Sequence, residues 1–271
     1  MKYKIVFSDI DGTLLNKERE LSPLTIQTIK EVKKQVPVVL ISARMPDAMY
    51  HLQKELDIRE SPIIAYNGGL VLVNDQPISS VEIPMDILKA IHQFNTENNL
   101  NVHLSLYYNN EWYVPQTDFW AQREENNTKV SPQIKSNAEV IEKWTTEHKA
   151  PHKIMAMGEP EKIDEISEFL SKNYNDELHF YRSNKNYLEI ANKKISKFSA
   201  IEYLLAHHFN ISKEDTIAFG DNYNDVEMIG GVGMGIAVAN ARQEVLDVST
   251  AVTANAKEDG VAQSLQKLFS L

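Results

Sequence analysis

The sequence predicts an α/β protein with a doubly wound, mostly parallel sheet and an inserted α+β domain. Two observations support this fold class. In the first and last thirds of the 271-residue chain, short runs of Val and Ile alternate with helical patterns, which is typical of parallel strands buried on both faces. In the middle third, the strand candidates are aromatic and half-polar, which is typical of an antiparallel sheet with one face covered by helices and the other wet.

The first third is predicted to contain three strands and two helices. One helix covers residues 22–34, with Ser22 as its N-cap and Pro23 at the first helical position, where a missing N–H costs nothing. The second helix covers residues 46–56. We expect the strands at residues 5–7, 38–41 and 63–66.

The last third repeats this alternation, and the middle third departs from it. In the last third, strands are expected at residues 216–219, 235–238 and 251–253, with helices over 196–208, from 224, from 241 and over 257–269. In the middle third, helices are expected over residues 85–98, 138–148 and 161–173, and strands at 102–108, 111–114, 154–157, 178–182 and 187–190.

The change of pattern predicts two domains, one built from two separated segments. Residues 1–83 and 191–271 would form the catalytic core, and residues 84–190 the inserted domain. The two chain crossings, near Ile83 and Ala191, are candidate hinges.

Composition excludes several classes of function. The chain has 28 Lys and Arg against 38 Asp and Glu, a net charge of −10, which argues against a general binder of nucleic acid or of anionic membranes. It has no cysteine, so disulfides, thiol catalysis and cysteine-bound zinc are excluded. No apolar stretch approaches the length of a signal peptide or a spanning helix, and we expect a cytoplasmic protein.

Two acidic clusters each follow a predicted strand of the core. Asp9 and Asp11 follow the first strand, with Gly12 allowing a sharp turn, and Asp221 and Asp225 follow the strand at 216–219. Because parallel strands end at the same edge of a sheet, these carboxylates would converge there. A lone Asp-x-Asp is more often a capped turn, but three or four converging carboxylates form a hard-oxygen site suited to Mg²⁺.

Four further features follow strands or begin helices in the same core. Ser42 offers a hydroxyl for phosphate oxygens or an ordinary N-cap, and Arg44 a substrate contact or a surface salt bridge. Asn67 and Gly68 offer amide donors or a hairpin turn. Lys197 begins a helix, so it would present positive charge to an anion or remain a solvated lysine.

Taken in order, these motifs resemble those of the haloacid dehalogenase-like (HAD) phosphohydrolases. The insertion of about 100 residues between the second and third motifs is similar to the Cof-type subfamily with a class IIB cap. The resemblance covers the whole chain and rests on Asp9-Ile10-Asp11-Gly12-Thr13-Leu14, Ser42, Lys197 and Gly220-Asp221-Asn222-Tyr223-Asn224-Asp225.

The resemblance implies a role for each motif. Asp9 would be the nucleophile that forms an aspartyl-phosphate, and Asp11 the general acid and then base, with a pKa above that of Asp9. Mg²⁺ would be held by the Asp9 carboxylate, the Asp11 backbone carbonyl and Asp221, with Asp225 close by. Phosphate-binding groups would come from Ser42, Asn67, Gly68, Lys197 and Asn224, with Arg44 as a substrate contact.

Two positions depart from the family pattern. The second motif reads Ser42-Ala43-Arg44 instead of Thr-Gly-Arg, which keeps the hydroxyl and leaves the placement of Arg44 open. Phe198 replaces the usual glycine after Lys197, which would narrow the pocket or repack the start of the helix. Neither change removes a catalytic group.

The resemblance implies a phosphatase of small phosphorylated metabolites, with a sugar phosphate or a cofactor phosphate as substrate. Three other readings remain open: a true dehalogenase, which would need neither Asp11 nor the second acidic cluster; a phosphotransferase or mutase; and a non-catalytic regulatory module. We expect no nucleic-acid or membrane partner, and a monomer or weak homodimer.

Overall fold

The computed structural model describes residues 2–271 and divides them into two compact units. Unit 1 comprises the segment that ends at Ser79 together with Ser196–Leu271, and unit 2 is Ser80–Ile195. The predicted inserted domain, residues 84–190, lies within unit 2. Within residues 2–271, no helix has both the length and the apolar character that crossing a bilayer requires.

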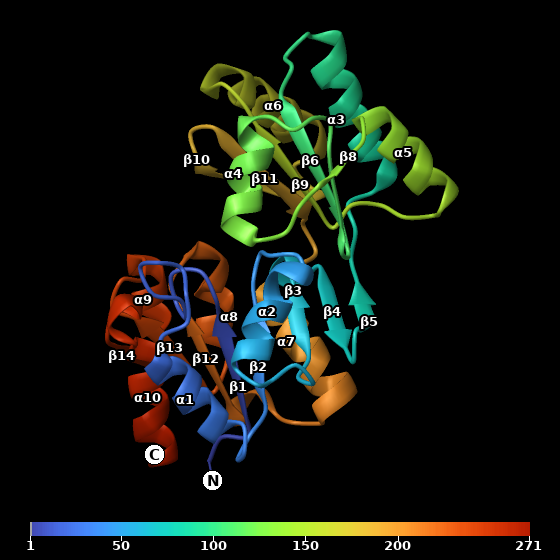
Figure 1. The fold of residues 1–271 in the computed structure, drawn as a ribbon. Helices are drawn as coiled ribbons and strands as arrows, with labels where there is room; N and C mark the ends of the chain where they lie inside the picture. Colours follow the sequence, from blue (N-terminus) through green and yellow to red (C-terminus); the bar gives the residue numbers. More distant parts are fainter. Residues whose placement is uncertain (1) are drawn as a thin grey trace. The chain divides into compact units, whose positions relative to one another are not determined.

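Unit 1 contains an eight-stranded sheet in the order β14-β13-β12-β1-β2-β3-β4-β5 (Figure 1). The pairs from β14 to β3 are parallel, and β3 pairs with β4 in the antiparallel sense. This sheet confirms the predicted fold class. The strands are β1 (Ile5–Asp9), β2 (Val38–Ile41), β3 (Ile63–Ala65), β4 (Leu70–Val73), β5 (Gln76–Ser80), β12 (Thr216–Gly220), β13 (Met234–Val238) and β14 (Ala251–Thr253).

Strands β4 and β5 were not predicted from the sequence. They are joined at Asn74 and Asp75, which both have positive φ angles of 49° and 61°. Two consecutive left-handed residues are the signature of a tight hairpin turn, for which Asn and Asp are favoured. The Asn-Asp pair was therefore an available signal for this hairpin.

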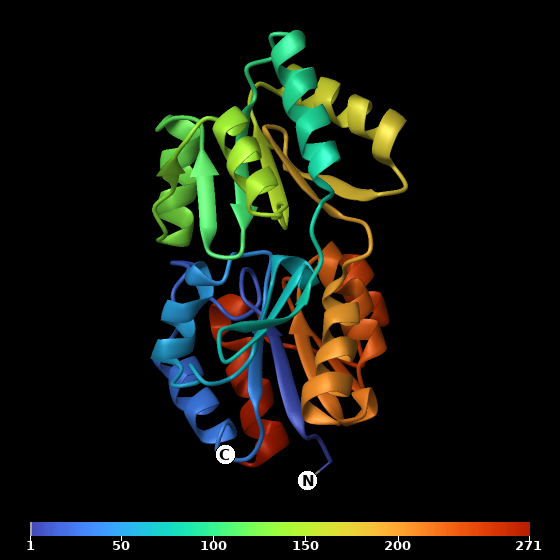
Figure 2. The same ribbon diagram turned by 90° about the vertical axis from the view of Figure 1, so that its right-hand side faces the viewer.

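Helices cover both faces of the unit 1 sheet. Figure 2 shows the sheet between α1 and α2 on one side and the orange helices of the C-terminal segment on the other. The residues Ile5, Phe7 and Val39 point toward α7, α8 and α9 and belong to one apolar cluster with them. The helices are α1 (Pro23–Val32), α2 (Asp47–Glu55), α7 (Lys197–Leu204), α8 (Val226–Gly231), α9 (Gln243–Val248) and α10 (Gly260–Phe269), with a π-helical turn after α7 at Leu205–Phe209 and 3-10 turns at Tyr66–Gly68, Lys213–Asp215, Tyr223–Asp225 and Ala256–Glu258.

Helix α1 begins as its sequence predicts. The Ser22 hydroxyl accepts a hydrogen bond from the backbone N–H of Thr25 at 3.0 Å, and Pro23 occupies the first turn. Ile29 and Val32 face the sheet and are fully buried. The cap and the apolar stripe together hold the helix against the sheet.

The strand order places β1 at the point where the chain changes direction. From β1 the chain builds outward through β2 and β3, and it later returns to β12 on the other side of β1. Ser8 pairs with Phe219, so Asp9 and the residues after Gly220 leave the sheet side by side. Ligands of open α/β sheets bind at such a switch point, outside the carboxyl ends of the strands.

Unit 2 contains a six-stranded sheet in the order β10-β11-β9-β6-β7-β8. The pairs are antiparallel except for β7 with β8. Its strands are β6 (His103–Tyr108), β7 (Glu111–Val114), β8 (Gln133–Ile134), β9 (Lys153–Met157), β10 (Leu178–Asn184) and β11 (Tyr187–Asn192). Its helices are α3 (Met85–Glu97), α4 (Phe119–Thr128), α5 (Asn137–Thr146) and α6 (Pro160–Tyr174).

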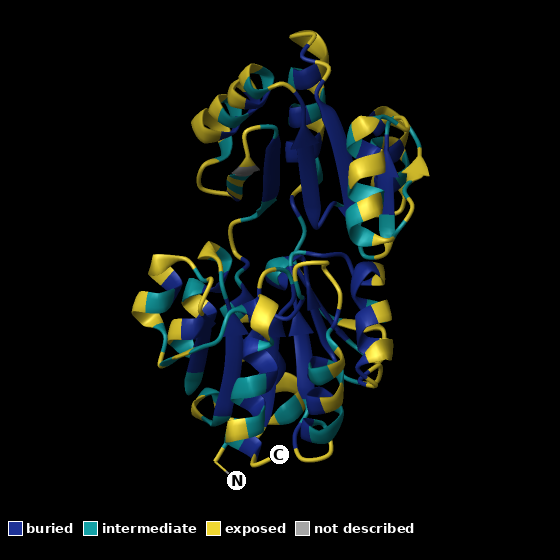
Figure 3. Cartoon of the chain, turned by 60° about the vertical axis from the view of Figure 1, so that its left-hand side comes forward, coloured by how far each residue is buried: buried dark blue, intermediate teal, exposed yellow. Residues whose placement is uncertain are grey.

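One face of this sheet forms the apolar core of unit 2. Leu104, Leu106 and Tyr113 point into it, where they meet Trp144 of α5 and Ile166 of α6. Figure 3 shows the central strands of both units in dark blue, whereas the helices carry exposed residues along their outer sides. This arrangement confirms the predicted antiparallel sheet with a helix-covered face.

The opposite face of the unit 2 sheet is drier than expected. His103 and Ser105 point away from the apolar core but are buried, with 4% and 0% of their surface exposed. Helix α4, which was not predicted, contributes to this burial: Asp118 accepts a hydrogen bond from the His103 ring at 2.8 Å, and Trp120 packs edge-on against Tyr187. The helix lacks a clear apolar stripe, with Ala121 its one buried residue, so its sequence pattern was weak.

Unit 2 is also held by a carboxylate that receives four hydrogen bonds. Glu111 accepts from Tyr113 at 2.9 Å, Lys143 at 2.9 Å, Lys149 at 2.6 Å and the Trp144 indole at 3.2 Å. Burial alone would raise the pKa of Glu111, but the bonds from the two lysines, the indole and the phenol lower it to about 2. The charged form of this carboxylate therefore stabilises the fold.

We expect Glu111→Gln to lower the free energy of unfolding of unit 2 by about 2 kcal/mol at pH 7, because hydrogen bonds to a charged group are lost. A carboxylate whose pKa is lowered by folding stabilises the folded state at pH values above its unfolded pKa of about 4.3, and this stabilisation is lost as pH falls toward 2. The difference in unfolding free energy between the wild type and the variant should therefore shrink across this range. The three tryptophans all lie in unit 2, so tryptophan fluorescence during urea unfolding reports on it. Glu147→Gln, at an exposed position beside the same lysines, should cost less than 1 kcal/mol, and equal costs would contradict the prediction.

Candidate active site

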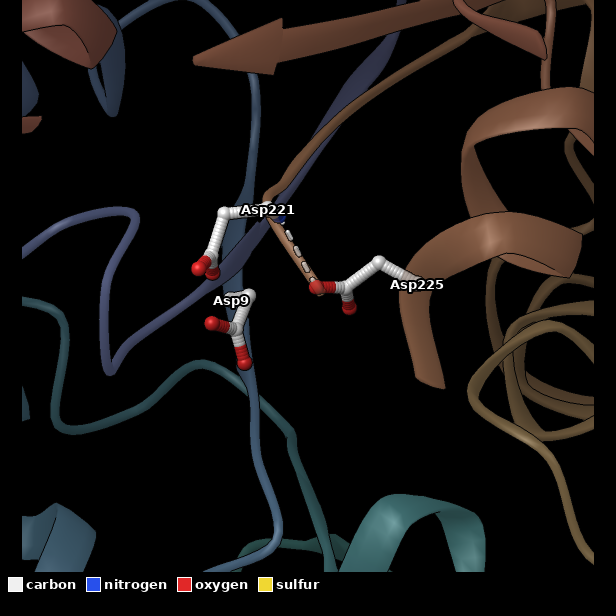
Figure 4. A group of neighbouring side chains, drawn as sticks. All are labelled: Asp9, Asp221 and Asp225. Atoms are coloured by element: carbon white, nitrogen blue, oxygen red, sulfur yellow. Dashed lines mark hydrogen bonds between the residues drawn. The ribbon is translucent and has the colours of Figure 1, made fainter. Parts of the chain in front are cut away.

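Three carboxylates converge at the carboxyl ends of β1 and β12. Asp9 is the last residue of β1, and Asp221 and Asp225 follow β12. One oxygen from each lies within 4.8 Å of the others. Figure 4 shows the three side chains grouped together. The structure thus brings together residues that are more than 200 positions apart in the sequence, at the predicted edge of the sheet.

A buried lysine joins two of these carboxylates. The ammonium of Lys197, at the start of α7, donates to Asp9 Oδ1 at 2.5 Å and to Asp225 Oδ1 at 2.6 Å. Lys197 and Asp225 have no exposed surface, and Asp9 is 5% exposed. The reading of Lys197 as a solvated surface residue is therefore wrong, because a buried ammonium needs partners of opposite charge.

The cluster carries an excess of negative charge. Three carboxylates surround one ammonium, which leaves two negative charges when all four groups are ionised. Burial raises the pKa of Asp9 well above its usual range, and the carboxylates of Asp225 and Asp221 raise it further against the opposing effect of Lys197. Burial acts to lower the pKa of Lys197, but the Asp225 and Asp9 carboxylates outweigh it and raise that pKa.

This charge and this set of donor atoms fit a divalent, oxygen-seeking cation. Burial, with a smaller contribution from the neighbouring Asp225 carboxylate, raises the pKa of Asp221 to about 6. Groups whose ionised forms are disfavoured in this way gain most from a cation among them. Carboxylate oxygens are the ligands that Mg²⁺ prefers, so Asp9 and Asp221 are suited to hold it.

Two glycines allow the acidic loops to approach this closely. Gly12 has a φ of +86°, and a Cβ on it would lie 2.4 Å from the Asp221 carboxylate. A Cβ on Gly220 would lie 2.6 Å from the Cβ of Asp225. Any other residue at these positions would push the loops apart, and at Gly12 it would also strain the backbone.

Asp225 holds the second acidic loop in shape. Its Oδ2 accepts hydrogen bonds from the backbone N–H groups of Asp221 at 3.0 Å and Asn222 at 3.1 Å, the first of which is drawn in Figure 4. Its Oδ1 is taken by Lys197. Both oxygens of Asp225 are thus engaged by protein groups, which favours a role in orienting Asp221 and Lys197.

Asp11 lies in the same loop as Asp9 but has different partners. Arg44 binds it with two parallel hydrogen bonds, Nε to Oδ2 at 2.7 Å and Nη2 to Oδ1 at 2.8 Å, and Arg19 adds a third to Oδ1 at 2.8 Å. Burial acts to raise the pKa of Asp11, but the two guanidinium groups outweigh it and lower the pKa. The structure therefore reverses the expected order, in which the pKa of Asp11 lies above that of Asp9.

Arg44 is committed to Asp11 and is not the surface residue that one reading of the sequence allowed. Its side chain is 8% exposed, and its third nitrogen donates to the backbone carbonyl of Ala48 at 3.1 Å. Two-pronged pairing of this kind fixes the orientation of the carboxylate as well as its charge. Arg44 is thus a positioning residue for Asp11.

The remaining predicted site residues lie on neighbouring turns. Ser42 follows β2 and is buried; its hydroxyl accepts from the backbone N–H of Arg44 at 3.2 Å, so it is not the N-cap of α2, which begins at Asp47. The Asn67 side chain accepts a hydrogen bond from Asn224 at 2.9 Å, which joins the turn after β3 to the loop after β12.

Gly68 acts through close packing. A Cβ on it would lie 2.3 Å from the carbonyl oxygen of Ser196, the residue that caps α7 directly before Lys197. The turn that contains it also connects β3 to antiparallel β4, which confirms the hairpin reading of this segment. Phe198 packs against Gly231, where an added Cβ would lie 2.4 Å from its ring, and it belongs to the apolar cluster of unit 1.

Sequence reasoning missed three residues that shape this site. The Thr13 hydroxyl donates to Asp221 at 2.8 Å, and the Asn240 amide donates to the backbone carbonyl of Gly12 at 2.8 Å. Arg19 pairs with Asp11. Thr13 lies within the recognised motif and could have been found there. Nothing in the local sequence indicated that Arg19 pairs with Asp11 or that Asn240 binds the backbone of Gly12.

Comparison with known proteins gives consistent results. Residues 6–265 match the family model described as haloacid dehalogenase-like hydrolase. A Haemophilus influenzae protein with a provisional phosphatase name is 37% identical over 273 residues, which is 99% of each chain. The 5-amino-6-(5-phospho-D-ribitylamino)uracil phosphatase of Bacillus subtilis is 25% identical over 276 residues, or 98% of each chain.

Two solved structures show the same fold. A haloacid dehalogenase-like hydrolase from Bacteroides thetaiotaomicron is 25% identical and matches with a TM-score of 0.88, covering 98% of this chain and 100% of that one. A sugar phosphatase of HAD subclass IIB is 23% identical and matches with a TM-score of 0.79, covering 98% of this chain and 99% of that one.

We expect Lys197→Met to lower the free energy of unfolding by about 3 kcal/mol at pH 8 without divalent cations, because it leaves two buried carboxylates without their ammonium. A carboxyl group whose pKa is raised by folding does not destabilise the protein below its unfolded pKa, where it is protonated in both states. It destabilises the folded state increasingly as pH rises, so the loss of unfolding free energy in the variant should be smaller at pH 5 than at pH 8. Unit 1 contains no tryptophan, so calorimetry should follow its unfolding while tryptophan fluorescence follows unit 2. Lys213→Met removes an exposed ion pair and serves as the control; equal losses would refute a special cost at Lys197.

Proposed function

Because the chain belongs to the haloacid dehalogenase-like hydrolases, we propose that it is a Mg²⁺-dependent phosphatase of small phosphorylated metabolites. The observation that carries the proposal is the cluster of Asp9, Asp221, Asp225 and Lys197 at the switch point of the sheet. The proposed substrate class is a sugar phosphate or a cofactor phosphate; one relative carries the name 5-amino-6-(5-phospho-D-ribitylamino)uracil phosphatase.

The first step is an attack on phosphorus. An oxygen of the Asp9 carboxylate forms a bond to the phosphorus of the ester, the bond to the leaving alkoxide breaks, and an aspartyl-phosphate results. Lys197, held against Asp9, balances negative charge on the transferring oxygens. The neighbouring turns supply hydroxyl, amide and backbone donors for these oxygens, from Ser42, Asn67, Gly68 and Asn224.

Asp11 supplies and removes protons. In the first step its carboxyl gives a proton to the leaving alkoxide; in the second it takes one from the water that attacks the aspartyl-phosphate and frees Asp9. Arg44 and Arg19 favour its ionised form, and the negative charge of an arriving phosphate offsets these cations and so raises its pKa. Arg44 keeps the carboxyl oriented during both steps.

Mg²⁺, held by the Asp9 and Asp221 carboxylates and the Asp11 backbone carbonyl, with Asp225 behind them, would supply positive charge for the phosphate oxygens. Unit 2 would act as the cap that distinguishes one leaving group from another. The cap in this proposal is the inserted segment of residues 84–190, which lies within unit 2.

Two alternatives are less well supported. A dehalogenase has no use for the acid at Asp11 or for three converging carboxylates, and a non-catalytic module has no reason to retain a buried, charge-rich cluster that costs stability. A phosphotransferase or mutase would use the same residues and pass the phosphoryl group to a second alcohol instead of water. Product analysis in the presence of sugar acceptors distinguishes this case from hydrolysis.

We expect Asp9→Asn to reduce phosphate release by at least about 1,000-fold, because an amide cannot replace the attacking carboxylate. The measurement is phosphate release from a panel of metabolites with Mg²⁺. Chelation of the wild-type protein should abolish activity, and excess Mg²⁺ should restore it. Asp247→Asn, at an exposed position in α9, is the matched control and should retain full activity. Full activity of Asp9→Asn, or of the chelated enzyme, would refute the mechanism.

We expect Asp11→Asn to slow esters of poor leaving groups about 100-fold and p-nitrophenyl phosphate only a few-fold, because an alkoxide needs the proton more than a nitrophenolate does. The measurement is kcat for a series of alkyl and aryl phosphates, plotted against the pKa of the leaving alcohol. The slope should steepen in the variant. If all esters slow by one common factor, Asp11 does not act as the acid.

A further inference from the structure

Asp11 does not need Arg19 to balance its charge. Arg44 alone binds both oxygens of the Asp11 carboxylate and matches its charge. Arg19 contributes one additional hydrogen bond, so the group of two arginines and one carboxylate carries a net positive charge. Arg19 is therefore a second cation on a carboxylate that Arg44 already binds with two hydrogen bonds.

Arg19 also has the exposure that a ligand-binding side chain requires. Its side chain is 51% exposed, whereas that of Arg44 is 8% exposed. Among the ion pairs of residues 2–271, Asp11 is its one partner, and one of its nitrogens makes that bond. A guanidinium has five N–H donors in a planar fork, so Arg19 retains donors for a carboxylate or a phosphate.

The loop around Arg19 holds it in this position. Arg19 has a φ of +62°, and its backbone N–H donates to the Asn16 carbonyl at 3.1 Å. The Asn16 side chain accepts from the backbone N–H groups of Glu18 and Glu20, both at 3.0 Å. These bonds form a compact turn, which reduces the entropy lost when Arg19 binds a ligand.

The position of Arg19 is fixed relative to the leaving group. If Asp11 protonates the leaving oxygen, that oxygen lies within a hydrogen bond of the Asp11 carboxyl. Arg19 Nη2 lies 2.8 Å from Asp11 Oδ1, so the leaving oxygen lies within about 6 Å of Arg19. A substituent one or two carbons from the ester oxygen spans this distance.

We infer that Arg19 determines substrate specificity by binding a second anionic group, a carboxylate or a phosphate, on the leaving alcohol next to the scissile phosphate. This inference rests on the proposed function and specifies its substrate class. It distinguishes the two arginines: Arg44 orients Asp11, and Arg19 pairs with Asp11 until the anion of the substrate takes its exposed donors. Neutral sugar phosphates and alkyl phosphates would then be the poorer substrates.

The test compares esters that differ in a neighbouring anion. The carboxylate pair is glycerol 2-phosphate and 2-phosphoglycerate, and the phosphate pair is myo-inositol 4-phosphate and myo-inositol 4,5-bisphosphate. Each is measured as a substrate by phosphate release or, where turnover is absent, as a competitive inhibitor of p-nitrophenyl phosphate hydrolysis. The enzymes are the wild type, Arg19→Gln, Arg19→Lys and the control Lys17→Ala, which changes an exposed lysine of the same loop.

We expect Arg19→Gln to reduce kcat/KM, or raise Ki, by about 10- to 100-fold more for the anionic member of at least one pair than for the neutral member of that pair, as the loss of a charge-assisted hydrogen bond predicts. The pair that responds identifies a carboxylate or a phosphate as the ligand. Arg19→Lys, which keeps the charge but not the fork, should recover part of the loss, and Lys17→Ala should match the wild type.

Other outcomes overturn the inference in distinguishable ways. If Arg19→Gln affects all four esters by one factor, or none of them, Arg19 serves only Asp11 or the loop, and the proposed phosphatase function stands. If the wild-type protein with Mg²⁺ releases phosphate from neither p-nitrophenyl phosphate nor any member of the pairs, the proposed function itself is wrong and the inference is wrong with it.

Discussion

The ammonium of Lys197 between Asp9 and Asp225 is the interaction on which the site of unit 1 depends. It joins the end of β1, the start of α7 and the loop after β12, three segments that are distant in the sequence. Burying three carboxylates together is unfavourable unless positive charge accompanies them, and one lysine supplies only part of it. Burial and the neighbouring carboxylates raise the pKa of Asp9, and the remaining negative charge makes the site suited to a cation.

Close backbone approach is the second requirement, and glycine meets it. Gly12 and Gly220 let the two acidic loops come together, and Gly68 lets the turn after β3 rest on the residue that caps α7. At each of these positions, a Cβ would overlap a carboxylate or a carbonyl oxygen. The charged groups of the cluster can therefore lie close together because these three positions have no side chain.

The two aspartates of the first motif work in opposite electrostatic environments. Asp9 is surrounded by carboxylates and one ammonium, whereas Asp11 is surrounded by the guanidinium groups of Arg44 and Arg19. Burial disfavours the charged form of both, and the neighbouring charges then shift their pKa values apart. In the proposed mechanism, an anionic ligand would compete for the cations that hold the Asp11 carboxylate ionised.

A large part of the molecule was predictable from the sequence for a physical reason. Buried parallel strands require continuous apolar runs, and catalytic loops at their ends require particular residues in a fixed order, so both leave a local record. The fold class, the inserted α+β segment and the family were therefore predicted, and the match over residues 6–265 confirms the family. Helix α4 and the β4–β5 hairpin were missed, because α4 buries little and the hairpin signal is two residues long.

The tertiary structure decided which side chains meet. The sequence by itself determined that carboxylates follow β1 and β12 and that a lysine begins α7, because strand ends and helix starts are local features. It did not determine that Lys197 is buried, that both arginines bind Asp11 or that the second face of the unit 2 sheet is dry. These depend on distances between segments that are remote along the chain, and burial and ion pairing arise only when folding brings such segments into contact.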